Sequence, residues 1–113
     1  KLNKSKFKII KNVKNLENEI ISHKYIISSA GYTMYKSLSF NKVCIIIPTS
    51  SHEKIISKHI KKMKLGLVTS TKFSDFKKTI EDAINRKLLI KNIKKNMLKC
   101  FGKNNFKRFL KNV

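Results

Sequence analysis

Short apolar runs alternate along the chain with longer stretches in which apolar residues recur every three or four positions. The runs are FKII at 7–10, KYIIS at 24–28, KVCIIIP at 42–48 and LGLVTS at 65–70. They lack the alternation of apolar and polar residues that a half-exposed strand shows, so they predict strands buried on both faces. The run at 42–48 gives the strongest signal, because it is rich in β-branched residues and ends at Pro48.

Helical spacing between these runs predicts helices over 15–22, 32–40 and 52–63. A further helix follows Ser74, which is its predicted N-cap, with Asp75 in its first turn, and a last helical segment comes after it. The apolar positions of these helices are Leu16, Ile20, Ile21, Met34, Leu38, Ile55, Ile56, Ile60, Met63, Phe76, Ile80, Ala83, Ile84, Leu88, Ile90, Ile93 and Met97. After Gly102 the apolar stripe continues with Phe106, Phe109 and Leu110.

This order of elements predicts an α/β fold, with a Rossmann-like parallel sheet of about four strands flanked by helices. No repeat or low-complexity linker interrupts residues 1–113, so they form one domain, with a basic helical segment at 91–113. The chain does not begin with Met, and we expect it to be a piece of a longer protein. No run approaches 18 apolar residues and no secretory signal is visible, so we expect a cytoplasmic location.

Ligands of open parallel sheets bind at the carboxyl ends of the strands, where loops lead into helices. The candidate loops are SSAG at 28–31, PTSSHE at 48–53 and VTSTKFS at 68–74. The first two are rich in small and hydroxyl residues, and each leads into a helix N-terminus, which favours anions. The alternative interpretation of the first loop is a tight turn, with Thr33 as a cap.

The net charge of +21 suggests a nucleic-acid partner, but the kind of basic residue argues against one. Of 27 basic residues only Arg86 and Arg108 are arginine, the residue that reads bases by paired hydrogen bonds. Lys, Ile and Asn together fill 52 of 113 positions, and these residues share AT-rich codons. We therefore expect a solvated lysine surface with no specific nucleic-acid partner.

The cysteines and histidines give no metal-binding pattern. Cys44 and Cys100 are isolated, which predicts buried thiols in a reducing compartment. His23, His52 and His59 have no cysteine pair near them, and the spacing of the last two is too wide for helical zinc ligation. We expect neither a metal nor a cofactor.

The order of motifs resembles the carboxyl-terminal half of GT-B-fold nucleotide-sugar enzymes. The matching segments are YIISSAGYTMYKSLSFNKVCIIIP and TSSHEKIISKHIKKMKLGLVTS, and the resemblance covers about residues 15–90. It is nearest to the UDP-sugar hydrolase of pseudaminic acid biosynthesis and the spore-coat polysaccharide family. The lipid-linked N-acetylglucosamine transferases of peptidoglycan synthesis are more distant. The resemblance implies one half of a GT-B fold, with a UDP-sugar as ligand.

The same resemblance implies a set of binding residues. Gly31, Tyr32 and Thr33 would hold the donor diphosphate through their backbone N–H groups. Lys36 stands where the family usually carries a Glu that holds the ribose hydroxyls. Since lysine only donates hydrogen bonds, either that contact is lost or Lys36 reaches a phosphate. Ser51 and His52 stand where an Asn-Gln or His-Gln pair usually lies near the sugar.

The predicted function is therefore the donor-binding domain of a UDP-sugar hydrolase or glycosyltransferase. The chain shows no catalytic dyad, and the resemblance places most catalytic groups in an N-terminal domain, the other expected partner. One alternative is a basic α/β module for RNA or an anionic membrane surface, since aromatic residues lie among the lysines of 91–113. Another is a remnant that folds but no longer binds UDP. A peripheral membrane contact is compatible with the leading interpretation too.

Overall fold

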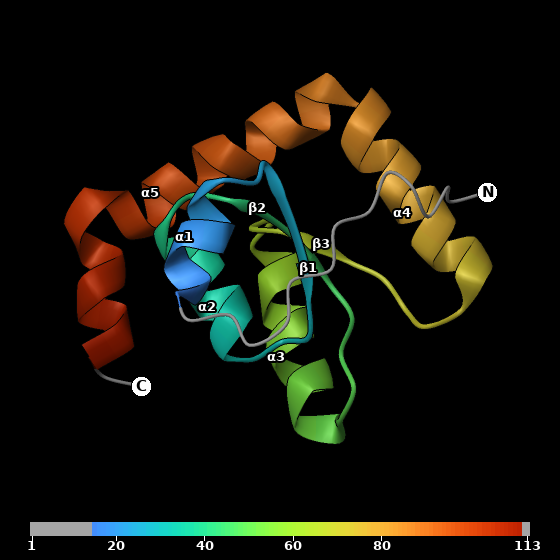
Figure 1. Ribbon diagram of the computed structural model, residues 1–113, viewed down its shortest axis with the longest axis horizontal. Helices are drawn as coiled ribbons and strands as arrows, with labels where there is room; N and C mark the ends of the chain where they lie inside the picture. Colours follow the sequence, from blue (N-terminus) through green and yellow to red (C-terminus); the bar gives the residue numbers. More distant parts are fainter. Residues whose placement is uncertain (1–14, 112–113) are drawn as a thin grey trace.

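The computed structural model describes the backbone of residues 15–111 and the side chains of residues 15–100. Along this range the elements are α1 (Leu16–Ile21), β1 (Tyr25–Ser28), α2 (Tyr32–Ser39), β2 (Val43–Ile46), α3 (Ser51–Lys62), β3 (Leu67–Val68), α4 (Phe73–Asn85) and α5 (Lys87–Lys111). Figure 1 shows their arrangement. The strand expected at 7–10 lies outside the described residues, as do the side chains of Phe101, Phe106 and Phe109.

The sheet has the order β1-β2-β3, and both pairs of strands are parallel. Tyr25 pairs with Val43 at one end of the first ladder, and Ser28 pairs with Ile46 at the other. The predicted α/β fold with a parallel sheet flanked by helices is therefore confirmed, with three strands in the described part. All four residues of β2 are buried, as expected for the central strand of a sheet that is covered on both faces.

Helices α2 and α3 cover one face of the sheet. The Cys44 Sγ atom lies 4.0 Å from the carbonyl oxygen of Met34 in α2. On the same face, a Cβ atom placed on Gly66 would lie 3.4 Å from side-chain atoms of both Ile46 and Ile60, and Ile60 belongs to α3. Right-handed crossovers that proceed in one direction across a sheet place both helices on the same side.

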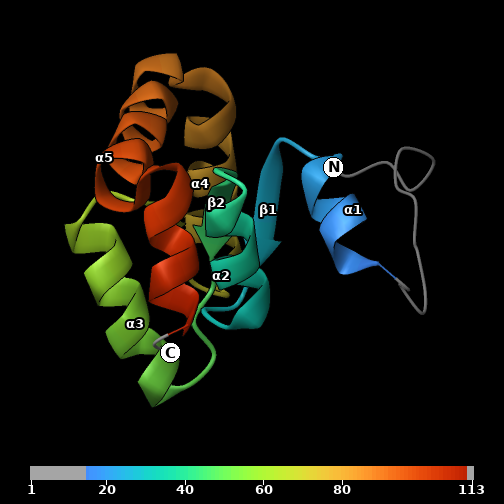
Figure 2. The same ribbon diagram turned by 90° about the vertical axis from the view of Figure 1, so that its left-hand side faces the viewer.

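The opposite face is covered by α4, and Figures 1 and 2 show α4 across the sheet from α2. Tyr25 points to this side, where its hydroxyl donates a 3.0 Å hydrogen bond to the carbonyl oxygen of Ala83 in α4. Helix α5 then passes the ends at which the strands begin. It lies near Lys24 at the start of β1, and its Asn96 side chain donates to the carbonyl oxygen of Lys64, just before β3.

Packing of α5 against the rest of the core buries three of its apolar side chains that the helical spacing identified: Ile90, Ile93 and Met97. They join the core around β2, together with Met34 and Leu38 of α2. The part of α5 that carries these residues lies at the amino-terminal edge of the sheet, opposite the loops at the carboxyl-terminal edge.

The predicted N-cap of the helix near 74–88 is wrong. Helix α4 begins at Phe73 with Lys72 as its N-cap, so Ser74 lies in the first turn instead of capping it. Ser70 organises this loop, since its hydroxyl donates to Asp75 and accepts from the Lys72 backbone N–H. Helix α5 continues past Gly102, in line with the apolar stripe beyond this residue, because a single glycine weakens a helix by only about 1 kcal/mol.

The predicted burial is also wrong at several positions. Cys100 is exposed, whereas Cys44 is buried as expected. Ile55 and Met63 of α3, Ile84 of α4 and Leu88 of α5 are each about half exposed or more, at 59%, 49%, 61% and 70%. These residues have helical spacing, but the sheet is narrow and contacts only part of each helix surface. In the described range no helix is both long and apolar enough to cross a membrane.

Candidate functional site

The carboxyl-terminal edge of the sheet brings the candidate loops together. Ile47 donates its backbone N–H to the Ser28 carbonyl, and Thr69 donates to the Ile46 carbonyl, each at 2.9 Å. The chain therefore leaves all three strands at neighbouring points. Helices α2 and α3 both begin at this edge, with Gly31 and Ser50 as their N-cap residues.

Gly31 adopts a backbone conformation that does not require glycine. Its φ angle is −130°, outside the left-handed region that favours this residue. A Cβ atom at this position would have Ser29 Oγ as its nearest neighbour, at 3.8 Å, which is an ordinary contact. Packing therefore does not explain the absence of a side chain, and Thr33 does not cap the helix as the tight-turn interpretation expected, because Gly31 is the N-cap residue.

The first turn of α2 presents backbone donors that the rest of the described chain does not use. The first hydrogen bond of the helix runs from the Tyr35 N–H to the Gly31 carbonyl, and no side chain caps the helix. The N–H groups of Tyr32, Thr33 and Met34 precede that bond, as the orphan donors of a helix N-terminus do. The Thr33 carbonyl accepts from Ser37, while the Tyr32 side chain is 65% exposed.

Glu53 connects the loop after β2 with the loop after β1. Its Oε1 atom accepts hydrogen bonds of 2.8 Å from both the backbone N–H and the hydroxyl of Thr49. These two bonds, helped by the Ala30 backbone N–H and the charge of His52, hold the pKa of Glu53 below its ordinary value. A carboxylate thus lies between the two loops, and any anion bound at α2 must share this edge with it.

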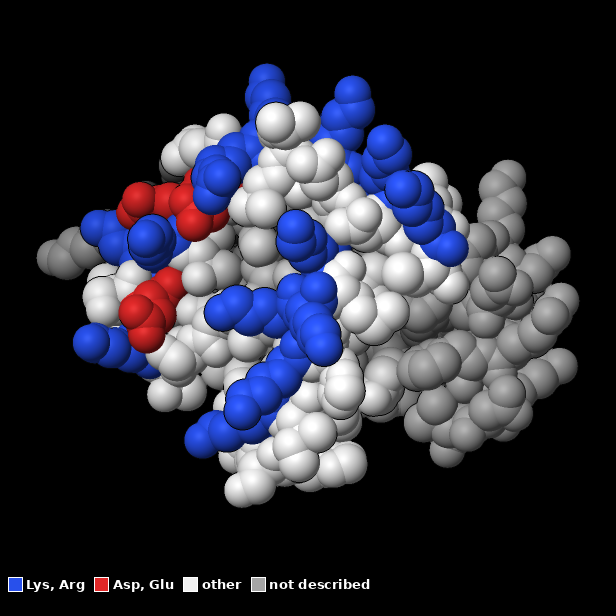
Figure 3. Space-filling view, turned by 180° about the vertical axis from the view of Figure 1, so that it is seen from behind, with Lys and Arg blue, Asp and Glu red and all other residues white. Residues whose placement is uncertain are grey.

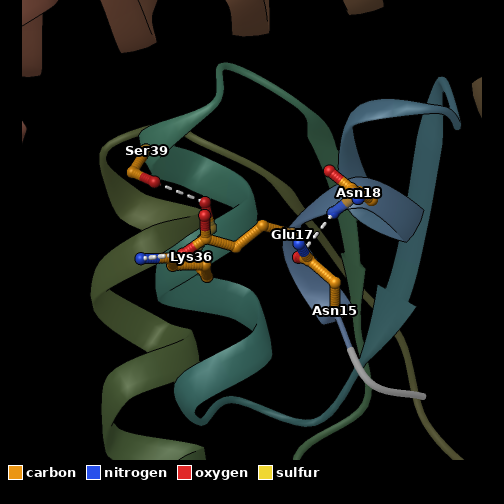
Figure 4. A network of polar contacts seen from close by, with 5 residues as sticks. All are labelled: Asn15, Glu17, Asn18, Lys36 and Ser39. Carbon is orange, nitrogen blue, oxygen red and sulfur yellow. Dashed lines mark hydrogen bonds and ion pairs between the residues drawn. The ribbon is translucent and has the colours of Figure 1, made fainter.

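Lys36 faces α1 instead of an open loop. Its Nζ atom lies 2.6 Å from Oε1 of Glu17, and Figure 4 shows the two side chains bridging α2 and α1. The hydrogen bond to Glu17 raises the pKa of Lys36. Asn15 fixes the start of α1, because its side chain accepts from the Asn18 backbone N–H at 3.2 Å. The ammonium group of Lys36 therefore already has an anionic partner.

Ser51 and His52 occupy the first turn of α3, and both are exposed. They lie at the same edge of the sheet as Gly31, Tyr32 and Thr33. The two loops are connected there because the carboxylate of Glu53, the residue after His52, accepts from the backbone N–H of Ala30. Lys36 is the one predicted site residue that the structure engages elsewhere.

Three residues of this edge were missed as site residues. Glu53 and Thr49 lie around the Ser50 N-cap, whose side chain accepts from the Glu53 N–H at 3.1 Å. A Ser-x-x-Glu pattern before an apolar helix is a capping-box signature, so residues 50–53 already carried the signal. Thr69 was also missed. Its Oγ1 atom is buried and has no hydrogen-bond partner in the described structure, which is unusual for a buried hydroxyl.

Comparisons with known proteins add no identification. No protein-family model matches the chain, and no curated protein is similar to it. Within residues 15–100, moreover, no three side chains of His, Cys, Asp or Glu are grouped so that they could hold a metal ion. The arguments for function therefore rest on the geometry of the carboxyl-terminal edge.

Proposed function

We propose that the chain is the nucleotide-sugar-binding domain of a UDP-sugar hydrolase or glycosyltransferase, acting in surface polysaccharide or nonulosonic acid biosynthesis. The observation that carries the proposal is Gly31. Neither the backbone nor the packing needs a glycine there, yet it stands at the uncapped start of α2 on the ligand-binding edge of a parallel sheet. A diphosphate that approaches the backbone closely accounts for the missing side chain.

In this proposal the N–H groups of residues 31–33 hold the diphosphate. The helix dipole and the free donors favour an anion there by about 1–2 kcal/mol when the site is partly buried. Glu53 is fixed by Thr49 and limits how far the second phosphate extends toward α3, because like charges repel at short range. Ser51 and His52 then lie on the side of the sugar, where an imidazole and a hydroxyl donate to its oxygens.

Lys36 gives the proposal its weakest contact. A carboxylate at this position would accept both ribose hydroxyls, whereas Lys36 is paired with Glu17. We propose that the ribose contact is lost and that the diphosphate and sugar contacts remain. Catalytic groups come from an N-terminal domain of the same protein, and the enzyme is cytoplasmic, since nucleotide sugars are made and used there.

Calorimetric titration with UDP and UDP-N-acetylhexosamine tests the proposal, on this chain and on a longer parent protein if there is one. Gly31→Val places a branched side chain where the diphosphate would lie, and we expect at least a tenfold loss of affinity. Thr33→Val removes one donor from the same turn and should weaken binding by a smaller factor. Thr71→Val is the matched control, since it removes an exposed threonine hydroxyl from the loop before α4.

A second pair of variants tests the ribose contact. Glu17→Gln frees Lys36, and Glu17→Gln combined with Lys36→Glu presents a carboxylate without a neighbouring negative charge. Since hydrogen bonds to charged groups contribute about 1.5–3 kcal/mol, the double variant should bind UDP at least tenfold more tightly than Glu17→Gln alone. The proposed function fails if UDP does not bind at millimolar concentration, or if Gly31→Val binds it as well as the wild type does.

A further inference from the structure

The corner between α4 and α5 combines protruding apolar side chains with a cluster of lysines. Helix α4 ends at Asn85 and α5 begins at Lys87, so the chain turns sharply here, near the top of Figure 1. Ile84 and Leu88 lie on either side of the turn and are 61% and 70% exposed. Exposed apolar residues are common singly, but two that flank one corner form a local apolar tip.

Beside this tip lies a cleft of about 300 Å³ between β1 and the start of α5. Its apolar wall includes Tyr25, Ile84 and Ile90. The charged residues that line it are all lysines: Lys24, Lys87, Lys91 and Lys94. The Lys24 ammonium also lies 5.4 Å from the centre of the Tyr25 ring. A cleft with an apolar wall and only cations around it fits a phosphate that is attached to an apolar body.

None of these lysines forms an ion pair within 4.0 Å in the described part of the chain. Glu81 and Asp82 stand near the end of α4, yet the only ion pair among the described residues joins Lys36 to Glu17 at the other side of the sheet. Figure 3 shows lysine and arginine side chains along the upper rim of the molecule, where α5 runs, and a smaller group of acidic side chains at the left-hand end of this rim. Because no ion pair offsets their mutual repulsion, these lysines favour an external anion.

We propose that the α4–α5 corner docks on an anionic membrane surface. Ile84 and Leu88 enter the interfacial layer, while Lys87, Lys91 and Lys94 contact lipid phosphates and one headgroup occupies the cleft. The apolar tip distinguishes this partner from RNA, which offers phosphates but no apolar layer. The inference does not depend on the proposed UDP site, because the corner lies at the amino-terminal edge of the sheet and Gly31 at the carboxyl-terminal edge.

Co-sedimentation with vesicles tests this surface. We expect the chain to bind vesicles of phosphatidylcholine with about one-third phosphatidylserine, and to bind pure phosphatidylcholine vesicles much more weakly. Each lysine near an anionic surface contributes a factor of about five, so Lys91→Gln with Lys94→Gln should lower the partition coefficient about 30-fold. Lys58→Gln with Lys61→Gln on α3 removes the same charge from exposed positions elsewhere, and should lower it less than threefold.

A second pair of substitutions tests the contribution of the apolar tip. Ile84→Ser with Leu88→Ser changes two exposed side chains, so the fold is retained, and binding to anionic vesicles should fall at least tenfold. Equal effects of the α3 and α5 lysine pairs would overturn the proposal in favour of attraction by net charge alone. Binding of a short single-stranded RNA would also overturn the proposal under three conditions. The chain would have to bind the RNA more tightly than the vesicles, the Lys91 and Lys94 variant would have to bind it more weakly, and the Ile84 and Leu88 variant would have to bind it as well as the wild type does.

Discussion

Alanine substitutions at Gly66 and Gly31 should affect the stability of the fold differently, because the fold requires a glycine at the first position and not at the second. At Gly66 the new Cβ atom would lie 3.3 Å from the Cys44 carbonyl oxygen and 3.4 Å from Ile46 and Ile60. The carbonyl belongs to the central strand, whose backbone is held by pairing on both sides, and both isoleucines are part of the core. Overpacking of this kind costs about 1–3 kcal/mol, against about 0.4–1 kcal/mol gained from a stiffer unfolded chain. We expect Gly66→Ala to lower the free energy of unfolding by about 1–2 kcal/mol.

At Gly31 the same change meets only Ser29 Oγ, at 3.8 Å. The gain from the unfolded chain is offset by the slightly poorer N-cap preference of alanine, so the free energy of unfolding should change by less than about 0.5 kcal/mol. Urea unfolding followed by far-UV circular dichroism measures both variants. With an m-value of about 1 kcal/mol/M, Gly66→Ala should shift the midpoint by about 1–2 M and Gly31→Ala by less than about 0.5 M. A loss above about 1 kcal/mol at Gly31 would show that the fold does need this glycine, and would remove the main argument for a ligand there.

Two further predictions concern single side chains. Burial raises the pKa of the Cys44 thiol to about 12, whereas Cys100 is exposed. An aromatic disulfide reagent at pH 8 should therefore react quickly with one thiol in the native chain and with two thiols in urea. Two fast-reacting thiols in the native chain would contradict the packing of β2. The folded-state pKa of Glu53 is lowered, so its stabilising contribution is complete above the unfolded value of about 4.3 and is lost as the pH falls through the folded value. Glu53→Gln should therefore be less stable than the wild type at pH 7, with a difference that shrinks below about pH 4, and a pH-independent difference would contradict this.

The sequence was sufficient for the elements whose burial is continuous. The run at 43–46 is apolar at every position and becomes the central strand, buried on both faces, which local pattern alone predicts well. Helical spacing also located α2 and α3 to within one residue at each end. It failed for Ile55 and Ile84, because the pattern marks an apolar position without revealing whether a neighbouring element is wide enough to cover it.

The site was less accessible to prediction. Gly31 and the first turn of α2 were predicted to bind a ligand from the order of strand, small loop and helix, and their binding role is still a prediction. The pair between Lys36 and Glu17 joins two helices whose relative placement is a tertiary property, so no local pattern could indicate it. The link from Glu53 to Thr49 is different, since it arises within five consecutive residues around a helix N-cap. Capping-box rules predict the bond from the Glu53 N–H to the Ser50 side chain, but they direct the Glu53 carboxylate to the Ser50 N–H and not to Thr49, one residue earlier.

The unequal lengths of the strands determine where this sheet can grow. Among the described strands β2 is paired on both sides, and β3 has only two residues, too few to register a partner securely. Strand β1 has four residues and pairs on one side only, so its outer edge carries the longer row of outward-facing backbone donors and acceptors. A fourth strand, from whatever part of the protein it comes, would therefore be templated by Tyr25–Ser28, and the sheet would extend away from β3.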